Sequence, residues 1–192
     1  MPNQISLLIS LFSLLIHMTT SSSSSSSPSS FACPPTPATV HAKCAMTVQF
    51  DQPCDVVRTE MEARLRAESN WVDPHNQGTY TLSEATSNSD STNRLDASRL
   101  TGNKMYTDKL AFGFTNSTSQ SGCTVSACSV SQVTSILDMS TNYCNLRNLY
   151  CNSKQDSCPV VHHELTYKEA YQNCWQRNAA KCIATRQKVK EL

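Results

Sequence analysis

The chain has 192 residues, with 16 Lys+Arg against 15 Asp+Glu and a formal net charge of +1. Binding to a phosphate backbone requires a basic surface, so this balance argues against a nucleic-acid partner. Ten residues are cysteine, which is typical of an exported chain held together by disulfides, whereas cytosolic thiols stay reduced.

An apolar run from Ile5 to Ile16 lies close to the N-terminus. Its length suits the hydrophobic region of a secretory signal and is too short for a membrane span, which needs about 20 apolar residues. We expect a signal peptide over residues 1–20, with cleavage between 20 and 32, and no membrane span in the mature chain. Residues 21–43 are rich in Ser and Pro, which predicts a flexible arm.

Residues 44–138 predict an α+β core domain. Asp51 is a candidate helix N-cap and Pro53 suits the first helical turn. Apolar residues then recur every three or four positions, which predicts an amphipathic helix of about 15 residues. The residues of this apolar stripe are Cys54, Val57, Met61 and Leu65.

Alternating side chains after a turn at 73–78 predict four strands. They fall near residues 79–84, 95–99, 106–114 and 123–133, and polar loops separate them. A four-stranded antiparallel meander with the N-terminal helix packed on one face explains this order with short connections.

Residues 139–192 predict a cysteine-linked helical hairpin. Cys144 and Cys151 are seven residues apart, and Cys174 and Cys182 are eight apart, so the two spacings differ by only ~1.5 Å along a helix. Antiparallel helices then predict the disulfides Cys144–Cys182 and Cys151–Cys174. The fold class is thus α+β, with an N-terminal helix on a four-stranded meander and a disulfide-stapled hairpin after it.

The pairing of the other six cysteines stays open, with fifteen possible arrangements. A bridge from Cys54 to Cys123 or Cys128 is one guess, because that helix must pack on the sheet. Zinc is the competing use of cysteine, but the close C-x2-C pairs that it favours are absent. These six cysteines are Cys33, Cys44, Cys54, Cys123, Cys128 and Cys158.

Asn116-Ser117-Thr118 is a standard N-glycosylation sequon in an expected loop. In a eukaryotic secretory pathway, this sequon predicts a glycan on Asn116.

Part of the chain resembles a bacterial and plastid domain of unknown function, the one numbered fourteen ninety-nine. The residues that carry the resemblance lie in the fourth expected strand and after it, and the likeness spans about residues 95–149. Gln132 and Thr134 depart from the usual Arg and Gly of that family. The resemblance implies no activity, because none is established for the family. The matching positions are Ser129, Ser131, Val133, Asp138, Asn142 and Leu146.

Asp108 is the strongest candidate ligand-binding residue, because it interrupts an apolar strand face. A buried carboxylate needs a partner, and Arg99 on the neighbouring strand is the expected one. Structural pairing of the two is the simpler interpretation, and anchoring of a ligand is the alternative.

Other candidates for chemistry have simpler explanations. His162-His163-Glu164 lacks the spacing of a metal site and reads as a solvated loop, and Asp73 with His75 reads as part of a turn. A Ser nucleophile lacks the G-x-S-x-G context. We predict no catalytic residues, no metal and no cofactor.

The function expected from these features is that of a secreted or lumenal, disulfide-rich binding or structural module with an unknown extracellular ligand or protein partner. The alternative is a secreted hydrolase, or a protein that handles a small lipid or other ligand in a cleft on the sheet. Convergence of Asp108, His75 and His162 within hydrogen-bond reach of one deep pocket would favour the alternative. Dispersed side chains, or an Asp108 fully tied to Arg99, would favour the binding module.

Overall fold

The computed structural model of the protein describes residues 31–83, 93–117 and 122–183. The expected signal peptide and the serine tract up to residue 30 lie outside this part of the chain, as do residues 184–192 of the expected hairpin. Within the described part, no helix has both the length and the apolar character needed to cross a bilayer.

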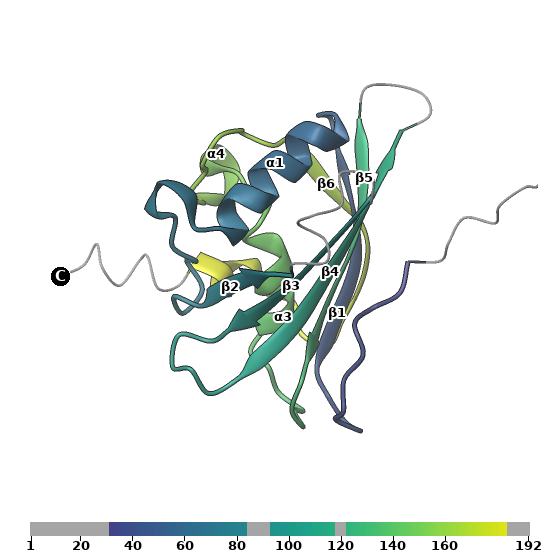
Figure 1. Ribbon diagram of the computed structural model, residues 1–192, viewed down its shortest axis with the longest axis vertical. Helices are drawn as coiled ribbons and strands as arrows, with labels where there is room; N and C mark the ends of the chain where they lie inside the picture. The colour runs from purple at the N-terminus through teal and green to yellow at the C-terminus, as the bar shows by residue number, and fades with distance from the viewer. Residues whose placement is uncertain (1–30, 84–92, 118–121, 184–192) are drawn as a thin grey trace, which may run out of the picture. The chain divides into compact units, whose positions relative to one another are not determined.

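One antiparallel sheet of six strands, in the order β2-β3-β4-β5-β1-β6, organises the described residues (Figure 1). Strands β2 to β5 follow one another as a meander, while β1 pairs with β5 and β6 adds to the outer edge of β1. The bounds are Lys43–Phe50 (β1), Thr79–Leu82 (β2), Arg94–Leu100 (β3), Thr107–Asn116 (β4), Cys123–Ser131 (β5) and Tyr167–Cys174 (β6).

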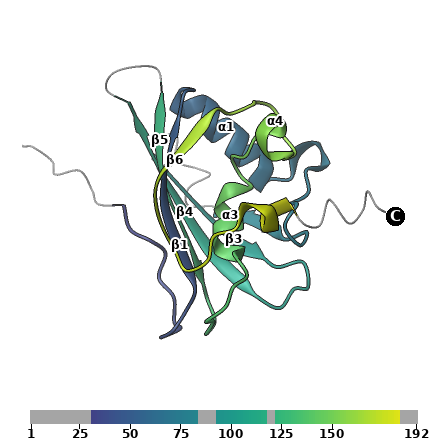
Figure 2. The same cartoon turned by 180° about the vertical axis from the view of Figure 1, so that it is seen from behind.

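Three helices cover one face of this sheet, and the extended segment 31–42 runs along the other face (Figures 1 and 2). The helices are α1 (Cys54–Leu65), α3 (Thr141–Arg147) and α4 (Ser153–Asp156), with short 3₁₀ turns at Glu68–Asn70 (η1) and Ala179–Ile183 (η2). Thr36 in the extended segment donates to the Ser131 carbonyl at 2.8 Å. This contact fixes the segment beside the end of β5.

Hydrophobic side chains between the helices and the sheet form the core. Every second residue of β1 is buried there, as expected for a strand with one face in a core. The apolar stripe of α1, with Val57, Met61 and Leu65, packs onto the same cluster. The β1 residues in the core are Cys44, Met46, Val48 and Phe50.

Five disulfides tie distant parts of the chain together, and the described residues contain no free cysteine. Two of them fasten an extended or helical segment to β5, and a third joins β1 to β6. The pairs are Cys33–Cys128, Cys44–Cys174, Cys54–Cys123, Cys144–Cys182 and Cys151–Cys158. The protein is therefore disulfide-rich.

The expected fold class is wrong. Among the described residues, the sheet has six strands instead of the expected four, because segment 43–50, where no strand was expected, forms β1, and residues 167–174 form β6 instead of a helix. No C-terminal helical hairpin exists in the described part of the chain. Cys144 is joined to Cys182, but Cys151 is bonded to Cys158 and not to Cys174.

The sheet edge and the core explain why residues 167–174 are a strand. The main-chain groups of β1 on this side would be unpaired without β6, and an exposed edge is unfavourable. Tyr167 also packs against Phe50 and Tyr150, with ring centroids 6.2 and 4.8 Å away. These long-range contacts make residues 167–174 a strand, although the spacing of the cysteines predicted a helix.

Candidate functional site

A pocket of about 460 Å³ opens at one end of the sheet, and we call it the sheet-end pocket. Three connections form its walls: the turn after Asp73, the hairpin between β3 and β4, and the segment between β5 and α3. This volume is within the range of about 300–1,000 Å³ that is usual for small-molecule sites. Its polar wall includes His75, Asp108, Ser131, Asp138 and Thr141, and its apolar wall includes Tyr106, Val133, Leu137 and Met139.

Strand register places a polar row beneath this pocket. Arg99 of β3 lies opposite Asp108 of β4, which lies opposite Ser131 of β5. All three face the helices, and all three are buried. The apolar face of the sheet therefore ends in a polar row, and this change marks the position of the site.

Helix α3 supplies asparagines that satisfy the polar row. Asn142, Asn145 and Asn148 are three residues apart, so they lie along one side of the helix. Asn145 donates to the Asp108 carboxylate at 2.8 Å and to Ser129 at 3.0 Å. Asn142 donates to the Ser131 hydroxyl at 3.0 Å. The amides on this side of α3 thus supply hydrogen-bond donors to the polar side chains of β4 and β5.

Asp73 is the direct partner of Arg99, a pairing that differs from the expected one with Asp108. Both side chains are fully buried and form an ion pair, and Asn148 donates to the second Asp73 oxygen at 2.7 Å. Arg99 also donates to the His75 carbonyl and to the Asn76 side chain. The pair therefore holds the turn that forms one pocket wall.

Asp108 is a buried carboxylate on the pocket wall, with 3% of its surface exposed. Burial raises the pKa of Asp108, while hydrogen bonds from Asn145 and Ser131 and the charge of Arg99 act in the opposite direction. Its net pKa remains above the ordinary value. Asp108 is thus stabilised as an anion only in part, and it can still gain from a further positive or donating group.

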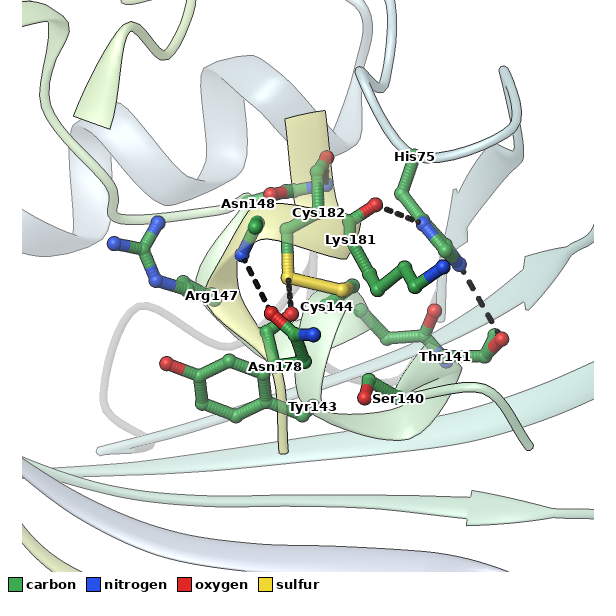
Figure 3. The surroundings of a disulfide bond; sticks show 12 residues. His75, Ser140, Thr141, Tyr143, Cys144, Arg147, Asn148, Asn178, Lys181 and Cys182 are labelled. Carbon is green, nitrogen blue, oxygen red and sulfur yellow. Dashed lines mark hydrogen bonds between the residues drawn. A yellow bond between two sulfur atoms is a disulfide. The ribbon is translucent and has the colours of Figure 1, made fainter. Parts of the chain in front are cut away.

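His75 is held in one orientation by two contacts (Figure 3). Its Nδ1 lies 2.9 Å from the Lys181 carbonyl oxygen, and its Nε2 lies 3.3 Å from the Thr141 hydroxyl. Because a carbonyl only accepts, Nδ1 carries the proton, and Nε2 then accepts from Thr141. Burial lowers the pKa of His75, which favours this neutral form.

The Cys144–Cys182 disulfide fastens the segment that orients His75. Figure 3 shows Lys181 beside the bridge, with its carbonyl directed at the histidine ring. Reduction or removal of this bridge would release η2 from α3, and with it the Lys181 carbonyl.

We expect the double variant Cys144→Ser/Cys182→Ser to lose about 4 kcal/mol of stability, because the bridge closes a loop of 38 residues. The matched variant Cys151→Ser/Cys158→Ser opens a loop of only seven residues, and we expect a loss of about 2 kcal/mol. Urea unfolding measures both, and NMR of the His75 ring reports its release. An unchanged His75 signal in the first variant would contradict the role given to the bridge.

Exposed hydrophobic residues surround the pocket mouth. Ile136, Leu137 and Met139 in the connection between β5 and α3 are 68%, 71% and 66% exposed. Met105 and Tyr106 in the β3–β4 hairpin are 65% and 47% exposed. A group of exposed apolar side chains around a pocket marks an interaction site.

The remaining candidates from the sequence lie elsewhere. His162 contacts Glu68 at 2.9 Å and is not part of the pocket wall, and the His162 and His163 amides donate to Glu60. Asn116 is exposed at the end of β4; its glycosylation stays a prediction. Among the described residues, no group of three or more His, Cys, Asp or Glu side chains is arranged to hold a metal ion.

The sequence analysis missed three features of the site. They are the ion pair of Asp73 with Arg99, and the residues Asn145 and Thr141. The N-x-x-N-x-x-N spacing from Asn142 to Asn148 is the signal that would have indicated a polar side of α3. No comparable signal links Asp73 to Arg99, which are 26 residues apart.

Comparison of the chain with models of known protein families, with curated proteins and with solved structures found no match. The resemblance over residues 95–149 therefore stays a prediction.

Proposed function

We propose that the protein is a secreted, non-enzymatic binding module that captures a small amphipathic ligand in the sheet-end pocket. The observation that carries this proposal is the combination of a polar inner wall, with Asp108 and His75, and an exposed apolar mouth. Such a pocket offers hydrogen bonds to one end of a ligand and apolar contact to the other.

Five disulfides and the expected signal peptide support an extracellular or lumenal location. In an exported protein, covalent bridges preserve the pocket walls without a large core. One of these bridges lies next to the site, because Cys144–Cys182 fastens the segment beside His75.

A secreted hydrolase is the second candidate, and one contact favours it. Thr141 donates to His75 Nε2 at 3.3 Å, so the imidazole lies where a base would activate the hydroxyl. A catalytic triad needs a third group that supports the histidine. Here that group is the Lys181 carbonyl, which orients the ring but carries no charge to stabilise an imidazolium. We therefore rank binding above hydrolysis.

A neutral amphipathic dye tests the binding function. We expect N-phenyl-1-naphthylamine to gain fluorescence with the full chain, and Leu137→Asp to weaken dye binding roughly 10-fold, because a charge replaces apolar contact at the pocket mouth. The control is Val72→Asp, which changes an aliphatic residue of similar exposure, 57%, that lines other surface cavities.

Two outcomes would contradict the proposal. One is an absence of dye binding by the folded wild-type chain. The other is a loss of binding in Val72→Asp that Leu137→Asp does not show, since this would place the dye in a different cavity. Cleavage of a chromogenic ester, abolished by His75→Ala and Thr141→Val, would favour the hydrolase instead.

A further inference from the structure

We propose that the sheet-end pocket selects organic cations, in which a compact ammonium group is attached to an apolar body. This inference rests on the proposed binding function and adds the chemical class of the ligand. It is carried by the charges on the pocket wall, the spare hydrogen-bonding capacity of one buried carboxylate and the apolar mouth.

Charge on the described wall of the pocket is negative. Asp108 and Asp138 contribute two carboxylates, and no Lys or Arg is among the described residues that line the cavity. The nearest buried cation, Arg99, is already paired with Asp73, and His75 donates from Nδ1 in its neutral form. A cationic ligand is therefore attracted, while a carboxylate or phosphate is repelled.

Asp108 has room for another donor. A carboxylate offers about four acceptor positions, and its donors in the described part of the chain are Asn145 and Ser131. Asp138 differs, since its oxygens accept from the Ser140 and Asn142 amides and from the Asn142 side chain. An ammonium group therefore binds at Asp108, with Asp138 adding long-range attraction.

The apolar body of the ligand then lies toward the pocket mouth. Tyr106, Leu137 and Met139 line the cavity and keep much of their surface exposed. The Tyr106 ring also offers a face to a cation, which adds attraction of the cation–π type. Burial of these side chains by a ligand removes apolar surface from water.

Among the described residues, Lys181 is a cation that lies close to His75. Its carbonyl binds His75, and in Figure 3 its side chain extends toward the same ring. It is exposed and does not line the cavity. Because this side chain is solvated and lies outside the cavity wall, we expect Lys181→Ala to leave the affinity for an amine unchanged or to raise it.

Three probes of one shape and different charge test the inference: 2-phenylethylamine, 2-phenylethanol and 3-phenylpropanoate. Calorimetry with the full, oxidised chain at neutral pH is expected to show the amine binding roughly 10- to 100-fold more tightly than the alcohol, as for hydrogen bonds to charged groups. The carboxylate is expected to bind most weakly. Salt should weaken binding of the amine and leave the alcohol unchanged.

Asp108→Asn is expected to lower the affinity for the amine roughly 10-fold or more and to change the affinity for the alcohol less than about twofold. The control is Asp51→Asn, which removes an exposed carboxylate outside the pocket wall. If Asp108→Asn does not fold, the charge series and its salt dependence on the wild-type chain still decide the question.

The outcomes separate the inference from the proposed function. Equal or tighter binding of the alcohol or the carboxylate overturns the cation preference while binding in the pocket stands. Binding of the neutral dye with no response to any of the three probes also overturns the preference. Failure of the dye and of all three probes overturns both.

Discussion

Glu60→Ala is expected to destabilise the protein by more than about 5 kcal/mol, the largest effect of any single substitution in the helix α1. Glu60 is fully buried and forms an ion pair with Arg64 at 2.7 Å. It also accepts hydrogen bonds from three successive amides, those of Val161, His162 and His163, at 2.9, 2.7 and 2.8 Å.

The size of this effect follows from the groups that the substitution leaves without a partner. A buried charge that loses its partner costs about 3–5 kcal/mol, and each buried amide left unsatisfied adds about 1–3 kcal/mol. Glu62→Ala is the matched control on the same helix. Its pair with Arg58 is about one quarter exposed, so we expect a loss below about 1 kcal/mol.

The measurement is urea unfolding at neutral pH, together with the yield of folded, oxidised protein. The total stability of a typical domain is about 5–15 kcal/mol, so we expect Glu60→Ala to leave little folded material. Glu60→Gln keeps one acceptor oxygen and is expected to lose less. A loss in Glu60→Ala that is no larger than in Glu62→Ala would contradict this account.

Acid should reveal the same interaction in the wild-type chain. Burial alone raises the pKa of Glu60, but the three amides and Arg64 outweigh it, so the net pKa lies below the ordinary value of a glutamate. A depressed pKa means that the stabilisation is complete above the unfolded pKa and is lost as pH falls through the folded pKa. Asp108, with its raised pKa, acts in the opposite sense, because its protonation favours the folded state.

Strands β2 to β5 and the first helix could be predicted from local patterns. The four strands expected after the turn at 73–78 are present as β2 to β5, and the apolar stripe from Val57 to Leu65 faces the core. In each case the spacing of the hydrophobic residues is that of a strand or helix that buries one face and exposes the other. Local sequence carries this information because each element buries one face of its own.

Strands β1 and β6 could not be predicted in this way. Cys44, Met46 and Val48 alternate like a strand, but the preceding prolines suggested an arm, and nothing nearby indicates that β1 inserts between β5 and β6. The disulfide Cys44–Cys174 spans 130 residues, so its pairing depends on the whole topology. The disulfide Cys151–Cys174 was predicted from the similar spacing of cysteines on two expected helices. Because Cys174 lies in a strand, β6, that spacing does not determine which cysteines meet.

Of the candidate site, one residue could be predicted from the sequence, but the hydrogen-bond network around it could not. The interruption of an apolar strand face singled out Asp108, which lies on the pocket wall. The other residues of the site come from other elements: Asn145, which donates to Asp108, from α3, and Asp73 and His75 from a turn that precedes β2. Contacts between such distant segments follow from topology, which single-sequence patterns do not specify.

Topology also explains why the pocket is at this end of the sheet. α1 covers the apolar rows of the sheet, while α3 lies over the end where Arg99, Asp108 and Ser131 replace apolar residues. The residues of this polar row are all buried, and three loops enclose the space beyond it. One buried ion pair, Asp73–Arg99, holds the turn that forms the nearest wall.

Asp73→Asn is therefore expected to destabilise the protein by about 3–5 kcal/mol and to weaken ligand binding in the same variant. The substitution preserves the shape of the side chain but leaves Arg99, which is fully buried, without a charged partner. Asp73 also accepts from the amides of His75 at 3.2 Å and Gly78 at 3.3 Å. Loss of the pair thus loosens the turn that presents His75 to the pocket.

A double-mutant cycle separates this pair from its surroundings. Arg99→Met alone leaves Asp73 buried and unpaired, whereas Asp73→Asn/Arg99→Met removes both charges, so we expect the double variant to be more stable than the sum of the single effects predicts. The control is Asp96→Asn, because its pair with Arg94 is about one third exposed and should contribute less than about 1 kcal/mol. Urea unfolding and dye titration of each variant supply the two readouts. Additive effects of Asp73→Asn and Arg99→Met would show that the two buried charges are independent, and the pair could not then be what holds the pocket wall in place.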